Sequence, residues 1–417
     1  MSDGRISSIG MPHTAPARVT DRIARETLFR LLGKVEIGSL TVHEGPQSYH
    51  FGEHDDPAHP HAEIHIHDAA VYAQVLSGGS LGAGEAYIKA RWSSPDPVQV
   101  TRLFSANMVA MESLDSGQSR IALLLLKVGH WLRRNTQKGS RENITAHYDL
   151  GNEFFELFLD PTMMYSAALF ADPAVSLEEA SVAKLDEICR QLSLKPDDHL
   201  LEIGTGWGGM AIYAAQHYGC KVTTTTISAE QYEYACEKVR EEGLEDRVTL
   251  LCEDYRHLKG QYDKLVSIEM IEAVGHQFYK DYFETCSRLL KDNGKMVLQA
   301  ITIPDRRYQE ARDSVDYIKR YIFPGGCLPS LSVMAEHVAR DTDMQMVHLR
   351  DITEDYAITL ARWRERFLLK TDAVEKMGFD QDFIRLWDYY LSYCEGGFRE
   401  RIIGTVQLAL VKPGFRF

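Results

Sequence analysis

The stretch LEIGTGWGGM, residues 201–210, places four glycines directly after a short apolar segment. Glycine lets the backbone turn sharply and approach a bound molecule closely, as loops that hold phosphates or cofactors do. No Gly-Lys-Ser/Thr follows, so a Walker loop is excluded. Gly204, Gly206 and Gly209 match the spacing G-x-G-x-x-G, but the second strand ends in TTTTISAEQ, with no acid before Glu230. A dinucleotide site needs such an acid for a ribose hydroxyl, and its absence weakens that assignment.

Acidic and aromatic residues around the turn favour S-adenosylmethionine (SAM) instead. Glu202 lies at the end of the first strand, where an acid in class I SAM enzymes steers the loop and the amino-acid end of the cofactor. Asp254 and Tyr255 follow the third strand and could hydrogen-bond to an adenine and stack on it. The alternative is that the glycines serve only to pack a helix against a strand.

Two carboxylates, Glu269 and Glu272, follow a further apolar strand and stand three residues apart. If this segment is helical, both side chains share one face. Crowding would raise the pKa of one carboxyl and make its carboxylate a better proton acceptor. The alternative is that Glu269 points to solvent.

Histidines and cysteines are the remaining residues that could bind a metal. In HPHAEIHIHD, His65 and His67 would face one side of a strand, as a pair of metal ligands could. No cysteine and no well-placed third ligand accompanies them, so a solvated strand face is favoured and no metal site is expected. The seven cysteines show no CxxC pair, so neither a zinc site nor a disulfide framework is indicated.

The elements that must position these residues form an α/β pattern from about residue 147 onward. Apolar strands alternate with helices such as 210–219, which predicts a Rossmann-like, mostly parallel sheet; the strands are 199–204, 221–228, 247–254, 262–270 and 294–302. Ahead of this domain (147–417) we expect a flexible tail (1–20), a smaller α+β domain (21–135) and a polar linker (136–146). In the smaller domain, 35–45 and 62–76 alternate as strands do, and 98–114 recurs at helical spacing.

The composition excludes several classes of protein. The chain has 417 residues, 44% of them hydrophobic, and a net charge of −14, which argues against a generic nucleic-acid binder. The N-terminus has no apolar run typical of a signal peptide, and no stretch is apolar enough to span a bilayer. A cytoplasmic protein is expected. Residues 119–138 carry Trp131 within an apolar block followed by cations, which fits either a core helix or a helix on an anionic membrane surface.

The region from 147 to about 408 resembles the cyclopropane-fatty-acyl-phospholipid synthase family. The matching stretches run in the family's order and include AHYDLGNEFFELFLDPTMMYS, LEIGTGWGG, SIEMIEAVG, YIFPGGCLPS and YYLSYCEGGFRERIIGTVQL. SLGAGEAYIKARWSSPD is similar to the lipid-binding accessory domain of the bacterial phospholipid synthases. The resemblance implies a SAM-dependent methyltransferase that adds a methylene unit to cis double bonds of phospholipid acyl chains. It also implies peripheral binding to the inner face of the cell membrane, and a homodimer.

Site residues follow from the same resemblance. It implies SAM contacts from Tyr165, Ser166, Gly204, Gly206, Thr226, Gln231 and Tyr255. Several aromatic residues are candidates for an acyl pocket and for stabilising a carbocation, among them Tyr317 and Tyr390, and Cys394 matches a family cysteine near that pocket.

The proton acceptor is where this chain departs from the family pattern. In the cyclopropane formers the resemblance implies a bound bicarbonate as base, held by a Cys, a Glu, a His, a backbone group at an Ile, and a Tyr. The corresponding residues here are Ala167, Glu272, Gln299, Ile301 and Tyr356, and Glu269 stands where glycine is usual. Because two of the holding side chains are lost, bicarbonate becomes doubtful. The product stays open between a cyclopropane and a methyl- or exomethylene-branched chain, and a small soluble substrate or a non-catalytic protein remain alternatives.

Overall fold

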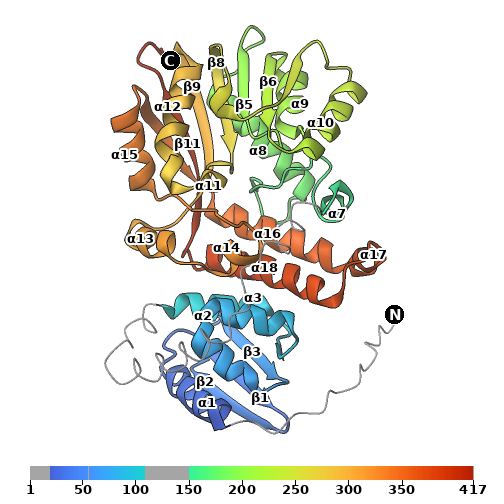
Figure 1. Cartoon of the computed structure of the whole chain (residues 1–417), viewed down its shortest axis with the longest axis vertical. Coiled ribbons are helices and arrows are strands. Elements are labelled where there is room, and N and C mark those ends of the chain that lie inside the picture. Colours follow the sequence, from blue (N-terminus) through green and yellow to red (C-terminus); the bar gives the residue numbers. More distant parts are fainter. Residues whose placement is uncertain (1–18, 55, 109–149, 417) are drawn as a thin grey trace. The chain divides into compact units, whose positions relative to one another are not determined.

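The computed structural model describes residues 19–54, 56–108 and 150–416, and the chain divides into two units, Met1–Arg134 and Asn135–Phe417 (Figure 1). The expected linker 136–146, the segment 119–138 and most of the expected tail lie outside the described residues. The two units are described separately below.

The N-terminal unit is a four-stranded sheet with helices, as expected for an α+β fold. Its sheet has the order β2-β1-β3-β4, with β1 parallel to β3 and antiparallel to β2. The strands are β1 (Ser39–Glu44), β2 (Gln47–Gly52), β3 (His61–Ile66) and β4 (Trp92–Ser93), and the helices are α1 (Val19–Leu32), α2 (Ala70–Ile88) and α3 (Pro97–Ala106).

The strand predicted over 62–76 is wrong in its second half. Strand β3 ends at Ile66, and the Asp68 carboxylate accepts a hydrogen bond from the Ala70 N–H at 2.9 Å, where α2 begins. An acidic side chain that accepts from a free N–H at this point favours a helix start. Val71, Tyr72 and Leu76 are buried residues of α2, so this part of the predicted strand is helical.

The C-terminal unit contains a seven-stranded sheet of order β10-β11-β9-β8-β5-β6-β7. Strands β9, β8, β5, β6 and β7 are parallel neighbours, and β11 and β10 extend the sheet in antiparallel fashion. This confirms the predicted mostly parallel, Rossmann-like sheet. The strands are β5 (His199–Ile203), β6 (Lys221–Thr226), β7 (Val248–Cys252), β8 (Tyr262–Ile268), β9 (Leu290–Thr302), β10 (Gln345–Asp351) and β11 (Gly404–Val411).

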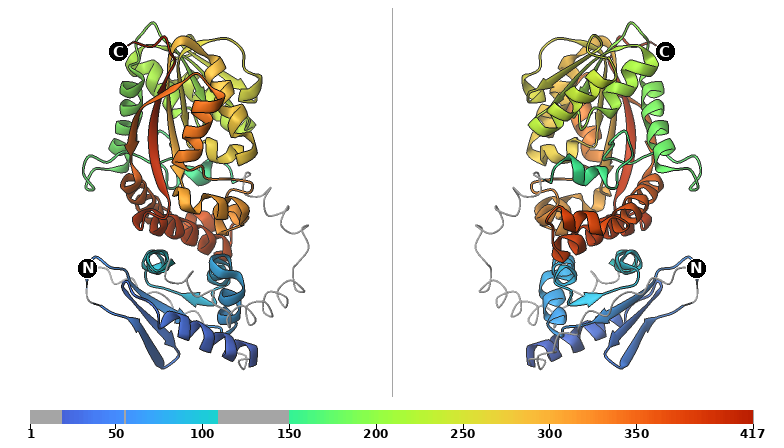
Figure 2. Two further views of the ribbon diagram at one scale, coloured as in Figure 1. Left: turned by 90° about the vertical axis from the view of Figure 1, so that its left-hand side faces the viewer. Right: turned by 90° about the vertical axis from the view of Figure 1, so that its right-hand side faces the viewer.

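Helices cover both faces of this sheet (Figure 2). Leu265 of β8 belongs to the cluster under α12 and α15, and its neighbour Val266 belongs to the cluster under α8 and α9. A strand that is buried on both faces is apolar at consecutive positions, which is why these strands read as continuous apolar runs. The covering helices are α8 (Leu177–Leu192), α9 (Gly209–Tyr218), α10 (Ala229–Glu241), α12 (Tyr279–Leu289) and α15 (Leu331–Asp341).

Shorter elements and a long helix pair complete the unit. Helices α16 and α18 pack against one another, and both contribute aromatic side chains to the site described below. These elements are α7 (Asn152–Glu156), α11 (Ile271–Val274), α13 (Asp305–Asp313), α14 (Tyr317–Tyr321), α16 (Thr353–Leu368), α17 (Thr371–Lys376), α18 (Gln381–Arg399) and the 3₁₀ turns Tyr255–His257 and His276–Phe278.

Gly209 joins the glycine turn to the segment that carries Tyr165. A Cβ on Gly209 would lie 2.4 Å from the Thr162 carbonyl oxygen, so a side chain there forces backbone to move. We predict that Gly209→Ala lowers stability by about 1–3 kcal/mol, the usual cost of overpacking. Thermal unfolding measures this, with Gly78→Ala as control because a Cβ there meets open space. Equal melting temperatures for Gly209→Ala and wild type would contradict the packing described.

Candidate active site

The predicted site residues gather at the carboxyl ends of the parallel strands, where open α/β sheets bind their ligands. The glycine turn follows β5, Thr226 ends β6, and Glu269 follows β8. Gln299 and Ile301 lie near the end of β9, and Tyr356 and Tyr390 approach from α16 and α18. The structure thus brings most of these residues to one edge of the sheet.

The glycine turn needs glycine for its backbone conformation. Gly204, Gly206 and Gly208 have φ of +101°, +52° and +93°, a region that side chains disfavour. A Cβ on Gly204 would lie 3.4 Å from the Cβ of Met270, which stands between the two candidate carboxylates. The turn therefore lies directly against the segment 269–272.

Glu202 supports this turn from beneath. Its carboxylate is buried and accepts a hydrogen bond from the Thr224 hydroxyl at 2.7 Å, and Thr224 in turn bonds to the Thr205 hydroxyl at 2.7 Å. Burial raises the pKa of Glu202 to about 8, opposed by the Thr224 hydrogen bond and by the charge of Lys184. A contact between Glu202 and a cofactor stays a prediction.

Lys184 is a functional residue that the sequence analysis missed. It is completely buried, and its ammonium donates to the Ser166 hydroxyl at 2.7 Å. Burial lowers the pKa of Lys184 to about 8, opposed by the negative charges of Glu269, Asp160 and Glu202. The signal was present: Lys184 recurs at helical spacing with buried Ala180 and Ser181 on α8. A lysine in such a stripe needs a buried acidic partner.

Some of the other residues that were predicted to bind SAM contact one another in the structure. The Thr226 hydroxyl donates to Gln231 Oε1 at 3.1 Å, and the Tyr165 and Tyr390 hydroxyls lie 2.8 Å apart. The Asp254 carboxylate is engaged by Arg256, which leaves Tyr255, half-buried beside it, as the more available surface for a stacked base. Contact of these residues with SAM stays a prediction.

Glu269 is the most unusual residue of the site. It is the residue directly after β8, its φ is +49°, and a non-glycine residue in this region costs about 1–3 kcal/mol. Its Oε1 accepts from the Ala167 N–H at 2.9 Å and from Gln299 Nε2 at 2.8 Å, and its Oε2 accepts from the Tyr356 hydroxyl at 2.8 Å. The alternative that Glu269 points to solvent is therefore wrong. The shared helical face is wrong too, because α11 begins only at Ile271.

Glu272 follows Glu269 by three residues, and its carboxylate accepts fewer hydrogen bonds. One carboxylate oxygen accepts from the Ile301 N–H, and the other is buried without a hydrogen-bond partner. Burial, and next the negative charge of Glu269, raise the pKa of Glu272 to about 8. Desolvation also raises the pKa of Glu269, but there the three donated hydrogen bonds and Lys184 oppose it. Three donors face the Glu269 carboxylate and one faces that of Glu272, so the ionised form of Glu269 is the better stabilised of the two.

Gln299 is held in one orientation by a row of amides. Its Oε1 accepts from Gln407 Nε2 at 3.0 Å, and Gln407 Oε1 accepts from Gln191 Nε2 at 2.7 Å. Gln299 and Gln407 are paired in register on β9 and β11, and both are completely buried. With its oxygen engaged, Gln299 turns its NH₂ group toward Glu269.

Aromatic rings surround the carboxylates. Tyr356 stacks on Phe398 with ring centroids 4.5 Å apart, and Tyr165 lies 5.2 Å from Trp363. Of the predicted acyl-pocket residues, Tyr390 lies at this wall, while Tyr317 is buried further along and donates to the Leu386 carbonyl at 3.0 Å. Burial raises the pKa of the Cys394 thiol, which keeps it neutral. An acyl-binding role for these residues stays a prediction.

The donors at this site do not fit a bound bicarbonate. The Ala167 N–H, the Gln299 amide and the Tyr356 hydroxyl all donate to Glu269 already. Ala167 has no side chain that could hold a second anion, and a second negative charge beside Glu269 would be repelled. No step below depends on bicarbonate.

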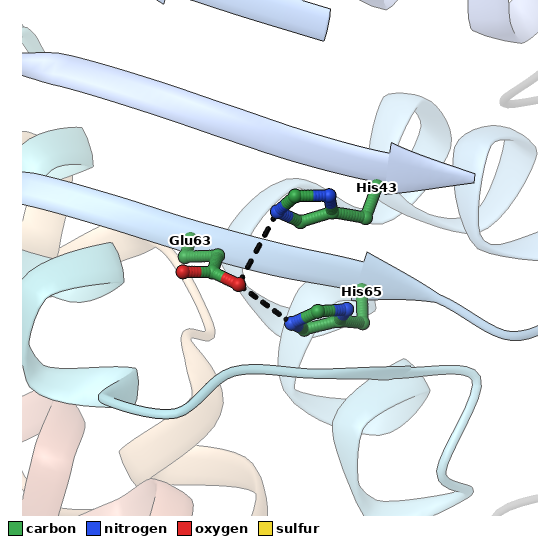
Figure 3. Close-up of side chains that lie close together, drawn as sticks. All are labelled: His43, Glu63 and His65. Carbon is green, nitrogen blue, oxygen red and sulfur yellow. Dashed lines mark ion pairs between the residues drawn. The ribbon is translucent and has the colours of Figure 1, made fainter. Parts of the chain in front are cut away.

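A separate cluster lies on the sheet of the N-terminal unit (Figure 3). His43 Nε2 and His65 Nε2 lie 3.2 and 2.8 Å from the same oxygen of Glu63, and these three side chains could hold a metal ion. The structure pairs His65 with His43 across β1 and β3, and His67 instead bonds to Ser93 at 2.7 Å. The sequence predicted no well-placed third ligand, whereas the structure places His43 and Glu63 beside His65.

The sequence is similar to that of a known family and to those of individual known proteins. A sequence profile of the family described as mycolic acid cyclopropane synthetase matches residues 135–408. A tuberculostearic acid methyltransferase of Mycobacterium tuberculosis is 36% identical over 377 residues, 86% of this chain and 85% of that protein. A cyclopropane-fatty-acyl-phospholipid synthase of Escherichia coli is 38% identical over 360 residues, 85% of this chain and 90% of that protein.

Solved structures show the same fold. A cyclopropane synthase of Mycobacterium tuberculosis and a mycolic acid cyclopropane synthase complexed with SAH (S-adenosylhomocysteine) and CTAB each superpose with a TM-score of 0.60. Each is 29% identical and covers 65% of this chain and 98% of its own.

The sheet, the glycine turn and these matches define a class I SAM-dependent methyltransferase, with SAM as the methyl donor. The chain belongs to the mycolic acid cyclopropane synthetase family, as the sequence resemblance implied. Among the residues that the structure describes, no helix is long and apolar enough to cross a membrane.

The raised pKa of Glu202 predicts a pH-dependent stability. Since its pKa is near 8 in the folded state and about 4.3 when unfolded, its contribution to stability is full below about pH 4.3 and is lost as the pH rises to 8. We predict that Glu202→Gln melts progressively higher than wild type between pH 5 and pH 8.5, by roughly 2–4 °C for each kcal/mol.

The matched control for that experiment is Glu284→Gln, on the exposed side of α12. Its melting temperature should follow that of wild type at every pH. A constant difference between Glu202→Gln and wild type across this range would contradict a raised pKa.

Proposed function

We propose that this protein is a SAM-dependent C-methyltransferase that adds a methylene unit to the cis double bond of unsaturated acyl chains in membrane phospholipids. The observation that carries the proposal is the Glu269 carboxylate, which accepts three hydrogen bonds and follows β8 directly beside the glycine turn.

The chemistry of an alkene explains why such a site is needed. A cis double bond is a weak nucleophile, so the sulfonium methyl must be held at near-attack distance. Methyl transfer leaves a carbocation on the neighbouring carbon, and the site must be dry because water would capture it. Aromatic faces such as those of Tyr165, Tyr356 and Trp363 stabilise a cation. A carboxylate is then needed to take a proton.

In this proposal the site residues fall into three groups: those that bind SAM, those that contact the acyl chain and those that surround the leaving proton. The glycine turn and the residues around it bind SAM: Tyr165, Ser166, Glu202, Gly204, Gly206, Thr226, Gln231, Asp254 and Tyr255. The acyl chain passes Ala167, Ile301, Tyr317, Tyr390 and Cys394. Glu269, Glu272, Gln299 and Tyr356 form the group that receives the proton.

The lipid substrate is supported by the relatives. Those most similar over most of this chain are named for fatty acyl phospholipids and tuberculostearic acid. Their similarity includes the N-terminal unit, which a methyltransferase for a small soluble substrate does not need. We propose that this unit binds the membrane surface from the cytoplasmic side, and that the protein is a peripheral homodimer.

A second product is favoured by the altered acceptor site. If the proton leaves the transferred methyl while a new C–C bond forms, the product is a cyclopropane. If a hydride shifts to the cation first, loss of a proton from the same methyl gives an exomethylene branch, and a methyl branch then requires a reductant. Ala167 and Gln299 depart from the pattern of the cyclopropane formers, and one relative is named as a tuberculostearic acid methyltransferase and not as a cyclopropane synthase.

The test is incubation of the pure enzyme with SAM and vesicles of unsaturated phospholipid, with saturated vesicles as control. We predict that SAH appears only with the unsaturated vesicles and that their acyl chains gain 14 mass units, the mass of one CH₂. Because the cyclopropane and exomethylene products are isomers, proton NMR must separate them by upfield ring protons or by vinylidene protons. No gain of CH₂ would refute the proposed function, and turnover of a small soluble acceptor alone would favour the alternative class.

A further inference from the structure

Glu269 has a backbone conformation that favours glycine. Its φ of +49° follows directly from the end of β8, and its N–H donates to the Gln299 carbonyl at 2.8 Å. Strain of this kind persists only where the surroundings enforce it, and it concentrates at functional sites. At Glu269 the conformation turns a carboxylate toward Ala167, Gln299 and Tyr356, which lie on three other segments of the chain.

Those three partners form a cradle for an anion. A backbone N–H, an amide NH₂ and a phenol hydroxyl all donate to the Glu269 carboxylate, at 2.8 to 2.9 Å. The row of amides from Gln191 fixes the Gln299 group before any ligand arrives. Lys184, buried behind Ser166, supplies a positive charge that favours the ionised form of Glu269. The cradle is therefore already filled, because its anion is the carboxylate of Glu269.

From this geometry we infer that Glu269 is a tethered substitute for the bicarbonate implied by the family pattern and is the group that accepts the proton from the carbocation. The inference rests on the proposed function and specifies its acceptor. It makes the enzyme independent of dissolved bicarbonate.

The Glu269 carboxylate has a lone pair left over for a proton, and part of its side chain is accessible. A carboxylate offers about four lone-pair positions, and the three hydrogen bonds leave one on Oε2. The side chain is half-buried, so part of it stays accessible from the site. Glu272 is the weaker candidate, because a single backbone N–H donates to its carboxylate, so its anion is held by fewer donors than that of Glu269.

The reaction balances with these groups. The alkene electron pair bonds to the sulfonium methyl, the carbon–sulfur bond breaks, and neutral SAH leaves a cation on the adjacent carbon. If that cation stays in place, one C–H bond of the transferred methyl breaks, its electron pair closes the ring, and the proton binds Oε2 of Glu269. If a hydride first shifts from the methyl-bearing carbon to the cation, the electron pair of such a C–H bond forms the exomethylene bond instead, and the proton again binds Oε2. The neutral carboxyl returns that proton to solvent before the next turnover.

Three forms of the enzyme test the inference: wild type, Glu269→Gln and Glu269→Gly. Glutamine keeps the volume but accepts no proton, whereas glycine opens the cradle and suits the positive φ. Glu284→Gln on α12 is the matched surface control. SAH formation is measured with unsaturated vesicles in buffer purged of carbon dioxide, with and without added bicarbonate, and calorimetric binding of SAH shows that each variant is folded.

We predict that wild type is unaffected by bicarbonate and that Glu269→Gln loses about 10²–10⁴-fold in rate, the usual contribution of a general base. Glu269→Gly should lose as much, and added bicarbonate or formate should restore part of its rate with saturation. A wild-type rate that rises tenfold or more with bicarbonate, or a Glu269→Gln rate within threefold of wild type, would overturn the inference.

Binding of ¹³C-bicarbonate, followed by NMR in the presence of SAH, decides the matter without turnover. Glu269→Gly should broaden the bicarbonate resonance and wild type should not. Broadening by wild type, or none by Glu269→Gly, would overturn the inference even if no lipid is methylated. The proposed function fails separately, if wild type releases no SAH with unsaturated vesicles.

Discussion

The site depends on three hydrogen bonds to one carboxylate. Ala167, Gln299 and Tyr356 come from a loop, a central strand and a C-terminal helix, and they meet only because Glu269 leaves β8 with positive φ. Each bond to an ionised group is stronger than a bond between neutral groups. Together they offset the strain at Glu269 and fix where negative charge lies in an otherwise aromatic site. The position of the glycine turn against Met270 then relates this charge to the cofactor.

Buried charges around this carboxylate balance one another. Lys184 is a completely buried cation, and the negative charges of Glu269 and Asp160 offset part of the cost of burying it. Burial raises the pKa of Glu272 and of Glu202 to about 8, which disfavours a second and a third negative charge beside Glu269. The arrangement places one lysine and one carboxylate with three hydrogen-bond donors at the centre of a largely buried site. That is the setting in which a carboxylate accepts a proton readily.

The sequence predicted the fold class, the order of the parallel strands along the chain and the glycine turn, because each has a local pattern of apolar residues and glycines. It placed Glu269 and Glu272 together but for the wrong reason, since a positive φ at Glu269 replaces the expected helix. Contacts between distant segments left no local signal, so the row from Gln191 through Gln407 to Gln299 could not be predicted. The start of α2 was missed because the alternation of residues 62–68 was extended too far, although residues 69–73 form a continuous apolar run.

The measurement that tests this account most directly is a crystal structure of the protein with SAH, grown from solution containing bicarbonate. The account predicts the Glu269 carboxylate within hydrogen-bond distance of the Ala167 nitrogen, the Gln299 amide and the Tyr356 hydroxyl, with no separate anion between them. A Glu269 side chain turned out of the cradle, with planar density of a small anion in its place, would contradict it.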